Sequence, residues 1–188
     1  MTDDAMRSPL AHLADLLGRV ATLSGGTVTA SEVVGLSQVS LRMSPDLVGR
    51  LGFEVPVDAN TVASGDGRDV VWLGPDEWLV VSNGSADDVL ASVASSLAGH
   101  HHAAVDVGAN RGVVELRGDG RRVLLATRCP IDLDRRTWRD GRCAQTLFGR
   151  APVLLHERED ATRLFVRPSY GDYIGELLAR AAATAVGD

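Results

Sequence analysis

Strand–turn–strand segments recur along this sequence, and they constrain its fold more than any other feature. Residues 143–156 predict two short strands joined by a tight turn, and residues 104–111 predict a similar segment. Residues 70–81 predict a hairpin around Gly74-Pro75-Asp76. Neither of the first two segments carries a nucleophile with its base, a metal cage or a phosphate loop. The sequence therefore predicts an ordered protein of strands and helices without a visible catalytic centre.

Helices separate these strand segments in an order that occurs twice. In the first half, a capping box at Ser85 and Asp88 starts an amphipathic helix over residues 86–98. The second half ends in a helix of the same kind, with Ser169 as its N-cap and Asp172 completing the box. We therefore predict an α+β fold of two related β-α-β-β-α-β halves, although their sequence identity is too weak to prove duplication.

Three segments are expected within one compact unit. Residues 1–32 form an N-terminal segment with a short helix that starts at Ser8-Pro9 and stops at Gly18. Residues 33–108 form the first α+β half, and residues 109–188 form the second. Each half alone is small, so we expect the two halves to share a core.

The composition argues against several classes of protein. The net charge of −6 argues against nonspecific nucleic-acid binding, which needs a basic surface. No apolar stretch approaches the length of a membrane span, and Met1-Thr2-Asp3-Asp4 lacks the basic start and apolar run of a signal peptide. Two cysteines are too few for a disulfide framework. We expect a cytoplasmic protein that binds neither nucleic acid nor membranes.

Two groups of residues invite a catalytic or metal-binding interpretation. Adjacent side chains of His100-His101-His102 point to opposite faces of an extended chain, so a solvated helix-to-strand loop is favoured over a metal site. Cys129 and Cys143 lack a paired CxxC motif and a visible activating base. We expect each cysteine to be a small buried apolar residue.

Two glycine-containing segments are interpreted as turns. Gly65-Asp66-Gly67 follows no clear strand and opens no helix, so it fails the context of a dinucleotide-binding motif. Gly118-Asp119-Gly120 lies between a strand and a helix and could hold an anion on backbone N–H groups, but a simple turn is favoured.

A loop over residues 128–142 carries interleaved arginines and aspartates around Trp138. A solvated loop is one interpretation. Arginines with an aromatic residue are also typical of protein interfaces, and we favour an interface over a ligand site. Arg111, at a tight turn, could clamp a carboxylate from a partner or from its own chain.

Six segments along the chain carry a family resemblance through their order and spacing, which hold from about residue 8 to the end. The segments are Ser8-Pro9-Leu10, Trp72-Leu73-Gly74-Pro75-Asp76-Glu77-Trp78-Leu79-Val80, Ala104-Val105-Asp106-Val107-Gly108-Ala109-Asn110-Arg111, Cys129-Pro130-Ile131-Asp132-Leu133, Cys143-Ala144-Gln145-Thr146-Leu147 and Val166-Arg167-Pro168-Ser169-Tyr170. Together they resemble the gamma subunit of heterotetrameric sarcosine oxidase. Single departures are Gly108, where the family often has Ser, and Pro168, where it often has Arg or a similar residue.

The resemblance implies a fold like the folate-binding domains of the glycine-cleavage T-protein, an aminomethyltransferase. It implies a complex that oxidatively demethylates sarcosine to glycine, with formation of hydrogen peroxide and 5,10-methylenetetrahydrofolate. The expected partners are the alpha, beta and delta subunits, with FAD, FMN, NAD, tetrahydrofolate and zinc held by them and no cofactor on this chain. The gamma subunit is then a scaffold for the folate domain of the large subunit, without catalytic residues of its own.

Four residues are candidate contacts to the partner subunits, because large aromatic residues and arginine carry most interface energy. Burial decides between an interface and a core role, so a fully buried Trp78 would leave this set. The candidates are Trp78, Arg111, Trp138 and Tyr170.

Two alternatives remain at this stage. One is a stand-alone folate-dependent aminomethyltransferase-like protein, which tetrahydrofolate binding by the isolated chain would support. The other is a generic interaction module, which co-purification without a flavoprotein would support.

Overall fold

The computed structural model describes residues 8–185 and divides into two compact units, each described here by itself. The expectation for Met1-Thr2-Asp3-Asp4 lies outside these residues. Residues 35–108 and 140–144 form the middle unit; described residues 8–34, 109–139 and 145–185 form the terminal unit. The N-terminal segment thus groups with the second half of the chain instead of standing apart.

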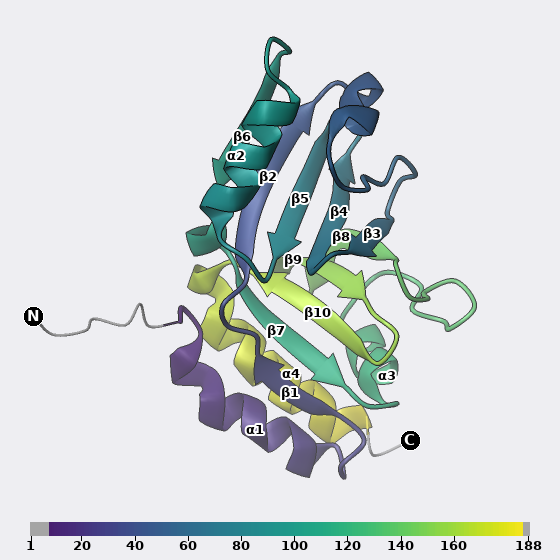
Figure 1. Ribbon diagram of the computed structural model, residues 1–188. Helices are drawn as coiled ribbons and strands as arrows, with labels where there is room; N and C mark the ends of the chain where they lie inside the picture. The colour runs from purple at the N-terminus through teal and green to yellow at the C-terminus, as the bar shows by residue number, and fades with distance from the viewer. Residues whose placement is uncertain (1–7, 186–188) are drawn as a thin grey trace, which may run out of the picture. The chain divides into compact units, whose positions relative to one another are not determined.

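The middle unit is a five-stranded antiparallel sheet with the strand order β3-β4-β5-β2-β6 (Figure 1). Its elements are β2 (Ser37–Met43), the 3₁₀ helix η2 (Pro45–Arg50), β3 (Val62–Gly65), β4 (Arg68–Gly74), β5 (Glu77–Ser82), α2 (Ala86–Ser96) and β6 (His102–Asp106). The predicted hairpin is β4–β5, and the predicted helix cap is present, since the Ser85 hydroxyl accepts the backbone N–H of Asp88 at 3.3 Å.

One apolar core fills the middle unit. Alternation along β2 places Val39, Leu41 and Met43 on one face, and the α2 residues Val89 and Val93 pack in the same cluster. All five are buried, and each side chain of this size contributes about 1.5–3 kcal/mol when it leaves water. The half-buried residues of η2 pack against the edge of this cluster.

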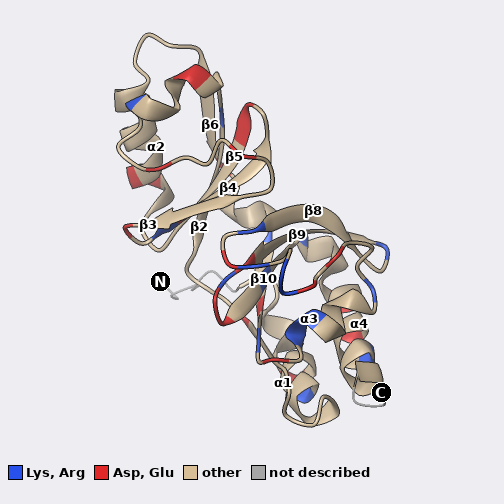
Figure 2. Cartoon of the chain, turned by 90° about the vertical axis from the view of Figure 1, so that its right-hand side faces the viewer, with Lys and Arg blue, Asp and Glu red and all other residues tan. Residues whose placement is uncertain are grey.

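The terminal unit is a second five-stranded sheet with the strand order β1-β7-β10-β9-β8. Figures 1 and 2 show its helices α1, α3 and α4 on one face of that sheet. Its elements are η1 (Ala11–Leu13), α1 (Ala14–Leu23), β1 (Thr29–Glu32), η3 (Gly108–Asn110), β7 (Gly112–Arg117), α3 (Arg121–Ala126), β8 (Cys143–Phe148), β9 (Ala151–Glu157), β10 (Ala161–Val166), η4 (Pro168–Tyr170) and α4 (Gly171–Ala185).

The predicted repeat is visible as a shared topology. Neighbouring strands in the terminal sheet have the order β7-β10-β9-β8, and the middle sheet has the corresponding order β2-β5-β4-β3. A fifth strand then pairs antiparallel with the first strand of each set. In the middle unit this strand is β6, which follows α2, whereas in the terminal unit it is β1, from the N-terminal segment. The N-terminal segment therefore completes the second sheet.

Close packing around Leu10 holds the N-terminal segment to the terminal unit. A Cβ atom on Gly112 of β7 or on Gly171 of α4 would overlap the Leu10 side chain. Leu10 is only 1% exposed. Because glycine alone leaves that space, the two glycines let the segment lie directly against the sheet and the last helix.

Several sequence predictions on the terminal unit are wrong in detail. The first helix continues past Gly18 to Leu23, since helical packing outweighs the cost of one interior glycine. Strand β1 lies in the N-terminal segment after Gly18, where no strand was predicted, because none of its four residues is buried. The last α-helix begins at Gly171, and Ser169 lies in the preceding 3₁₀ turn instead of capping the helix.

Candidate partner interface

Trp78 is a core residue of the middle unit. It faces Trp72 across the β4–β5 hairpin and is 1% exposed. Its indole Nε1 donates to the carbonyl oxygen of Pro56 at 2.8 Å, which satisfies the polar atom inside the core. By the burial criterion, Trp78 leaves the set of candidate interface residues. Sequence alternation could not show this, because the partner carbonyl lies outside the regular elements.

Trp138 is also buried, at 5% exposure, although it lies in the arginine-rich loop. Its indole Nε1 donates to the Glu157 carboxylate at 2.9 Å. Leu133 of the same loop is 5% exposed. The loop is therefore anchored inward by an aromatic and an aliphatic residue, and Trp138 leaves the candidate set as well.

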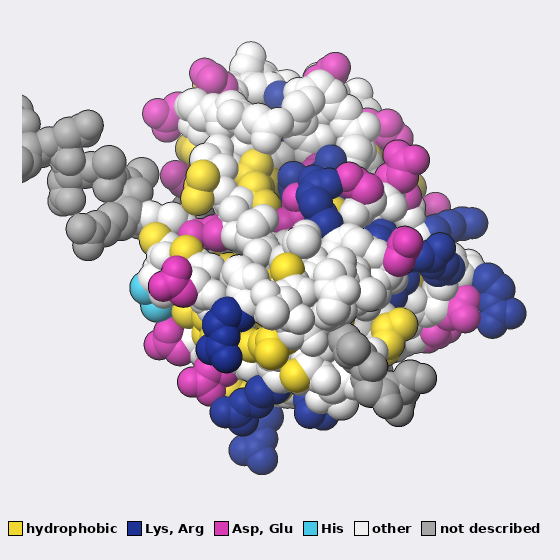
Figure 3. Space-filling view, turned by 90° about the horizontal axis from the view of Figure 1, so that it is seen from below, with side chains coloured by type: hydrophobic (Ala, Val, Ile, Leu, Met, Phe, Trp, Pro, Cys, Tyr) yellow, Lys and Arg dark blue, Asp and Glu magenta, His cyan; other side chains and the backbone are white. Residues whose placement is uncertain are grey.

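Two exposed arginines of this loop form ion pairs within the chain. Arg135 binds Asp119 at 3.1 Å, and Arg136 binds Asp134 at 2.9 Å. The hydrogen bonds from Arg136 hold the pKa of Asp134 below its usual value. Exposed pairs of this kind contribute little to stability. On the face shown in Figure 3, arginine and carboxylate side chains are interspersed, as expected for a surface of mixed charge.

Arg111 and Tyr170 are the two candidates that reach the surface, and both are half-buried. Arg111 lies between η3 and β7, and Tyr170 ends the 3₁₀ helix η4. Their contact with a partner stays a prediction.

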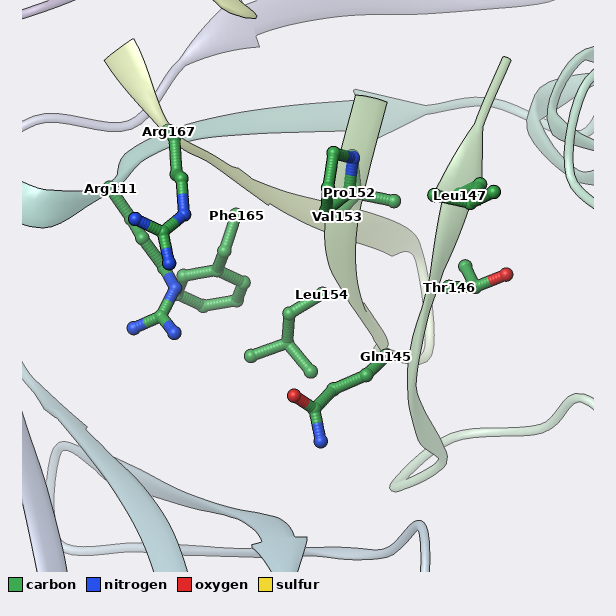
Figure 4. Close-up of a pocket in the computed structure, with 9 residues that line it drawn as sticks. All are labelled: Arg111, Gln145, Thr146, Leu147, Pro152, Val153, Leu154, Phe165 and Arg167. Atoms are coloured by element: carbon green, nitrogen blue, oxygen red, sulfur yellow. The ribbon is translucent and has the colours of Figure 1, made fainter. Parts of the chain in front are cut away.

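Arg111 lines a pocket of about 400 Å³ on the terminal unit (Figure 4). The pocket is built on β8, β9 and β10 and on the turn that precedes β7. Its lining consists of Arg111, Gln145, Thr146, Leu147, Pro152, Val153, Leu154, Phe165 and Arg167.

Strand register explains how the floor of this pocket forms. Phe165 on β10 lies directly opposite Leu154 on β9, so both side chains project from the same face. Arg163, Phe165 and Arg167 follow one another at a spacing of two, which brings Arg167 toward that face. Sequence reasoning did not single out Arg167, although this i, i+2, i+4 spacing was its signal.

Both thiols are buried and chemically quiet. Cys129 is 7% exposed and Cys143 is 1% exposed, and neither forms a disulfide. Burial raises the pKa of each thiol to about 12, so both stay protonated at neutral pH. The Cys143 Sγ lies 3.4 Å from the carbonyl oxygen of Thr61. The predicted role as small buried residues is confirmed.

The remaining sequence candidates form ordinary loops and turns. His102 Nδ1 lies 2.9 Å from the carbonyl oxygen of His100, and residues 8–185 contain no group of three or more His, Cys, Asp or Glu side chains arranged to hold a metal. Gly118 has φ +103 and begins the turn into α3, where the Gly120 N–H donates to Thr27. Gly65-Asp66-Gly67 joins β3 to β4. None of the helices in the described part is long and apolar enough to cross a membrane.

The fold places this chain in a class of proteins with an aminomethyltransferase-like architecture. The glycine cleavage system aminomethyltransferase T from Bartonella henselae superposes with a TM-score of 0.62 at 14% identity, over 96% of this chain and 60% of that chain. At this identity the likeness is one of fold alone. It agrees with the two α+β halves predicted from the sequence.

Sequence and structure together define the family. Residues 43–184 match the sarcosine oxidase gamma subunit family, and the chain belongs to it. A sarcosine oxidase subunit gamma from Arthrobacter sp. is 34% identical over 159 residues, which are 79% of this chain and 75% of that protein. The one from Corynebacterium sp. (strain U-96) is 32% identical over 176 residues, 89% of this chain and 85% of that protein.

A solved structure extends the match to almost the whole chain. One chain of the heterotetrameric sarcosine oxidase from Corynebacterium sp. U-96, solved in complex with pyrrole 2-carboxylate, superposes with a TM-score of 0.85. The two chains are 30% identical, and the match covers 96% of each. These matches identify the chain as a gamma subunit of a heterotetrameric sarcosine oxidase. The other subunits of that complex are the partners of this chain.

Proposed function

We propose that this chain is a scaffold that holds the folate domain of the large alpha subunit in register with the flavin site. The complex then oxidises the N-methyl group of sarcosine, with release of glycine and hydrogen peroxide. Tetrahydrofolate captures the one-carbon unit as 5,10-methylenetetrahydrofolate. The beta and delta subunits complete the assembly.

The observation that carries the proposal is the match to a chain of a heterotetrameric enzyme over 96% of both chains. A backbone likeness over nearly the whole of both chains supports a similar place for this chain in the assembly. The chemistry of the described residues agrees, since both thiols are buried with raised pKa values. Within residues 8–185 neither thiol is activated as a nucleophile, which suits a positioning role.

The cofactors fit the partner subunits better than this chain. FAD, FMN and NAD would need an open strand-to-helix glycine turn or a comparable cradle. Gly65-Asp66-Gly67 is a strand-to-strand turn, and the strand-to-helix turn at Gly118 and Gly120 is covered by Thr27, whose carbonyl oxygen accepts the Gly120 N–H. Zinc would need a ligand cluster that residues 8–185 do not contain. We therefore assign FAD, FMN, NAD and zinc to the other subunits, and we assign tetrahydrofolate to the folate domain of the alpha subunit as part of the same proposal.

Reconstitution without this chain tests the scaffold role. The other three subunits are purified together, and peroxide formation from sarcosine is measured before and after the isolated chain is added. We expect low activity or dissociation without the chain and recovery when it is added at one equivalent. Full activity and full assembly without it would contradict the scaffold role.

The shared fold with aminomethyltransferase T makes direct folate binding the second candidate function. Titration of the isolated chain with tetrahydrofolate, followed by calorimetry, separates the two. We expect no saturable binding. Binding with one-to-one stoichiometry would favour a folate protein in its own right.

A further inference from the structure

The pocket on the terminal unit has an uneven distribution of charge. Its described lining includes two arginines, Arg111 and Arg167, and no carboxylate. Arg163, which lies on β10 four positions before Arg167, binds Glu115 at 3.0 Å. Arg167 is exposed and forms no ion pair with any residue in the range 8–185. Arg167 therefore gives one end of the pocket a positive charge.

The rest of the pocket is lined by apolar side chains together with Gln145 and Thr146, and it is partly open to solvent. Phe165 and Leu154 form a floor that is 1% and 4% exposed. Leu147 on β8 is 43% exposed, and Pro152 is exposed beside it. Figure 4 shows both guanidinium groups at the Phe165 end of the pocket, with Leu147 and Thr146 at the other end. Apolar side chains thus line the pocket from its nearly buried floor to its exposed rim.

This combination fits a peptide segment better than a small molecule. Guanidinium groups bind carboxylates through two parallel hydrogen bonds, and arginine is enriched among the residues that dominate interfaces. A small-molecule site normally encloses most of its ligand. Here the charged group and the apolar rim both remain at the surface, where a partner polypeptide could cover them together.

We propose that this pocket docks a segment of another subunit that carries an aspartate or glutamate next to an apolar side chain. The carboxylate binds Arg167, and the apolar side chain packs on Leu147 and Pro152 above the floor formed by Phe165 and Leu154. The inference rests on the proposed assembly and names the surface through which this chain takes part in it.

Binding of variants to the complex of the other subunits tests the charged end. Arg167→Ala and Arg167→Glu are compared with Arg180→Glu, an exposed arginine on α4 whose partner is Glu176. Loss of one partner from a covered charge pair predicts about 30-fold weaker binding for Arg167→Ala, and more for Arg167→Glu. Arg180→Glu should stay within about threefold of the unaltered chain. Equal binding by the Arg167 and Arg180 variants would overturn the proposal.

A crosslink identifies the docked segment. A photo-reactive residue replaces Leu147, and the linked peptide in the assembled complex is sequenced. We expect a peptide of another subunit that contains Asp or Glu. Replacing that residue with Arg should restore binding of Arg167→Glu. A linked peptide without an acidic residue, or no restoration, contradicts the proposal.

A small-molecule occupant has its own signature. Glutarate at millimolar concentration would then raise the melting temperature of the isolated chain, Arg167→Ala would abolish the shift, and assembly would be unchanged. That result would also overturn the proposal. Failure of the unaltered chain to bind the other subunits would instead contradict the proposed function, so the two failures are distinguishable.

Discussion

The indole Nε1 of Trp138 donates a hydrogen bond of 2.9 Å to Glu157, a carboxylate with no exposed surface. Two neighbouring arginines at the start of α3, blue in Figure 2, bind the other carboxylate oxygen: Arg121 at 2.9 Å and Arg122 at 2.6 Å. The Thr162 hydroxyl also binds Glu157. This buried cluster holds the arginine-rich loop against the sheet, because Trp138 of the loop donates one of the hydrogen bonds to Glu157 on β9.

Replacement of Trp138 by Phe should destabilise the terminal unit. The variant keeps most of the apolar volume but removes one donor from a buried carboxylate, which costs about 1–3 kcal/mol. Urea unfolding of the isolated chain measures the change. Val123→Ala, at a side chain that is 59% exposed on α3, serves as the control and should shift stability by less than about 0.5 kcal/mol. Equal stability of the two variants would show that the indole hydrogen bond is unimportant.

Glu157→Gln should be more damaging than the Trp138 variant. It leaves Arg121, whose side chain is 4% exposed, and Arg122, at 14%, without their counterion. Breaking a buried pair in this way costs about 3–5 kcal/mol. The matched control is Glu176→Gln, which breaks an exposed i,i+4 pair with Arg180 worth about 0.5 kcal/mol or less. A loss for Glu157→Gln as small as the control's would contradict this account of the cluster.

Stability should fall at alkaline pH because of the two buried thiols. In the unfolded chain each thiol ionises near its ordinary pKa of 9.0, whereas burial raises the pKa to about 12 in the folded chain. Between these values the folded state binds more protons, so the free energy of unfolding decreases as pH rises. Each thiol contributes up to about 1.4 kcal/mol per pH unit in that window. The double variant Cys129→Ala, Cys143→Ala should show a shallower slope between pH 9 and 11, and an unchanged slope would refute the assignment.

Gly118→Ala should strongly destabilise the turn between β7 and α3. Gly118 has φ +103, and a Cβ atom there would overlap the carbonyl oxygen of Thr27. Backbone strain and overlap together predict a loss of about 3 kcal/mol or more. Gly99→Ala is the matched control, because Gly99 has φ +80 but open space around it, and strain alone predicts about 1–2 kcal/mol. Thermal melts of both variants decide, and a larger loss at Gly99 would contradict the steric argument.

The sequence predicts most strands and helices of the middle unit because their signals are local. It misses β3 (Val62–Gly65), so the prediction that Gly65-Asp66-Gly67 follows no strand is wrong; β3 has only four residues and pairs with β4 alone. Alternation at Val39, Leu41 and Met43 and the Ser85 cap depend only on neighbouring residues. Strand β1 was missed for the opposite reason. Its residues Thr29–Glu32 are exposed or half-buried, and it is a strand because β7 pairs with it from more than eighty positions away.

Residue type alone could not separate candidate interface residues from core residues. Residue type favoured Trp78 and Trp138, but each indole finds its acceptor inside the chain, at Pro56 and Glu157. Neither acceptor is close in sequence, so burial could not be read from the local pattern. Arg167 became visible only when strand register placed it beside the Phe165 and Leu154 floor.

Purification of the tagged chain from its own cells tests the central claim most directly. The visible spectrum and the sarcosine-dependent peroxide formation of the purified material are measured. The account predicts a yellow complex with larger subunits that produces peroxide when sarcosine is added. A colourless protein without partners and without turnover would contradict it.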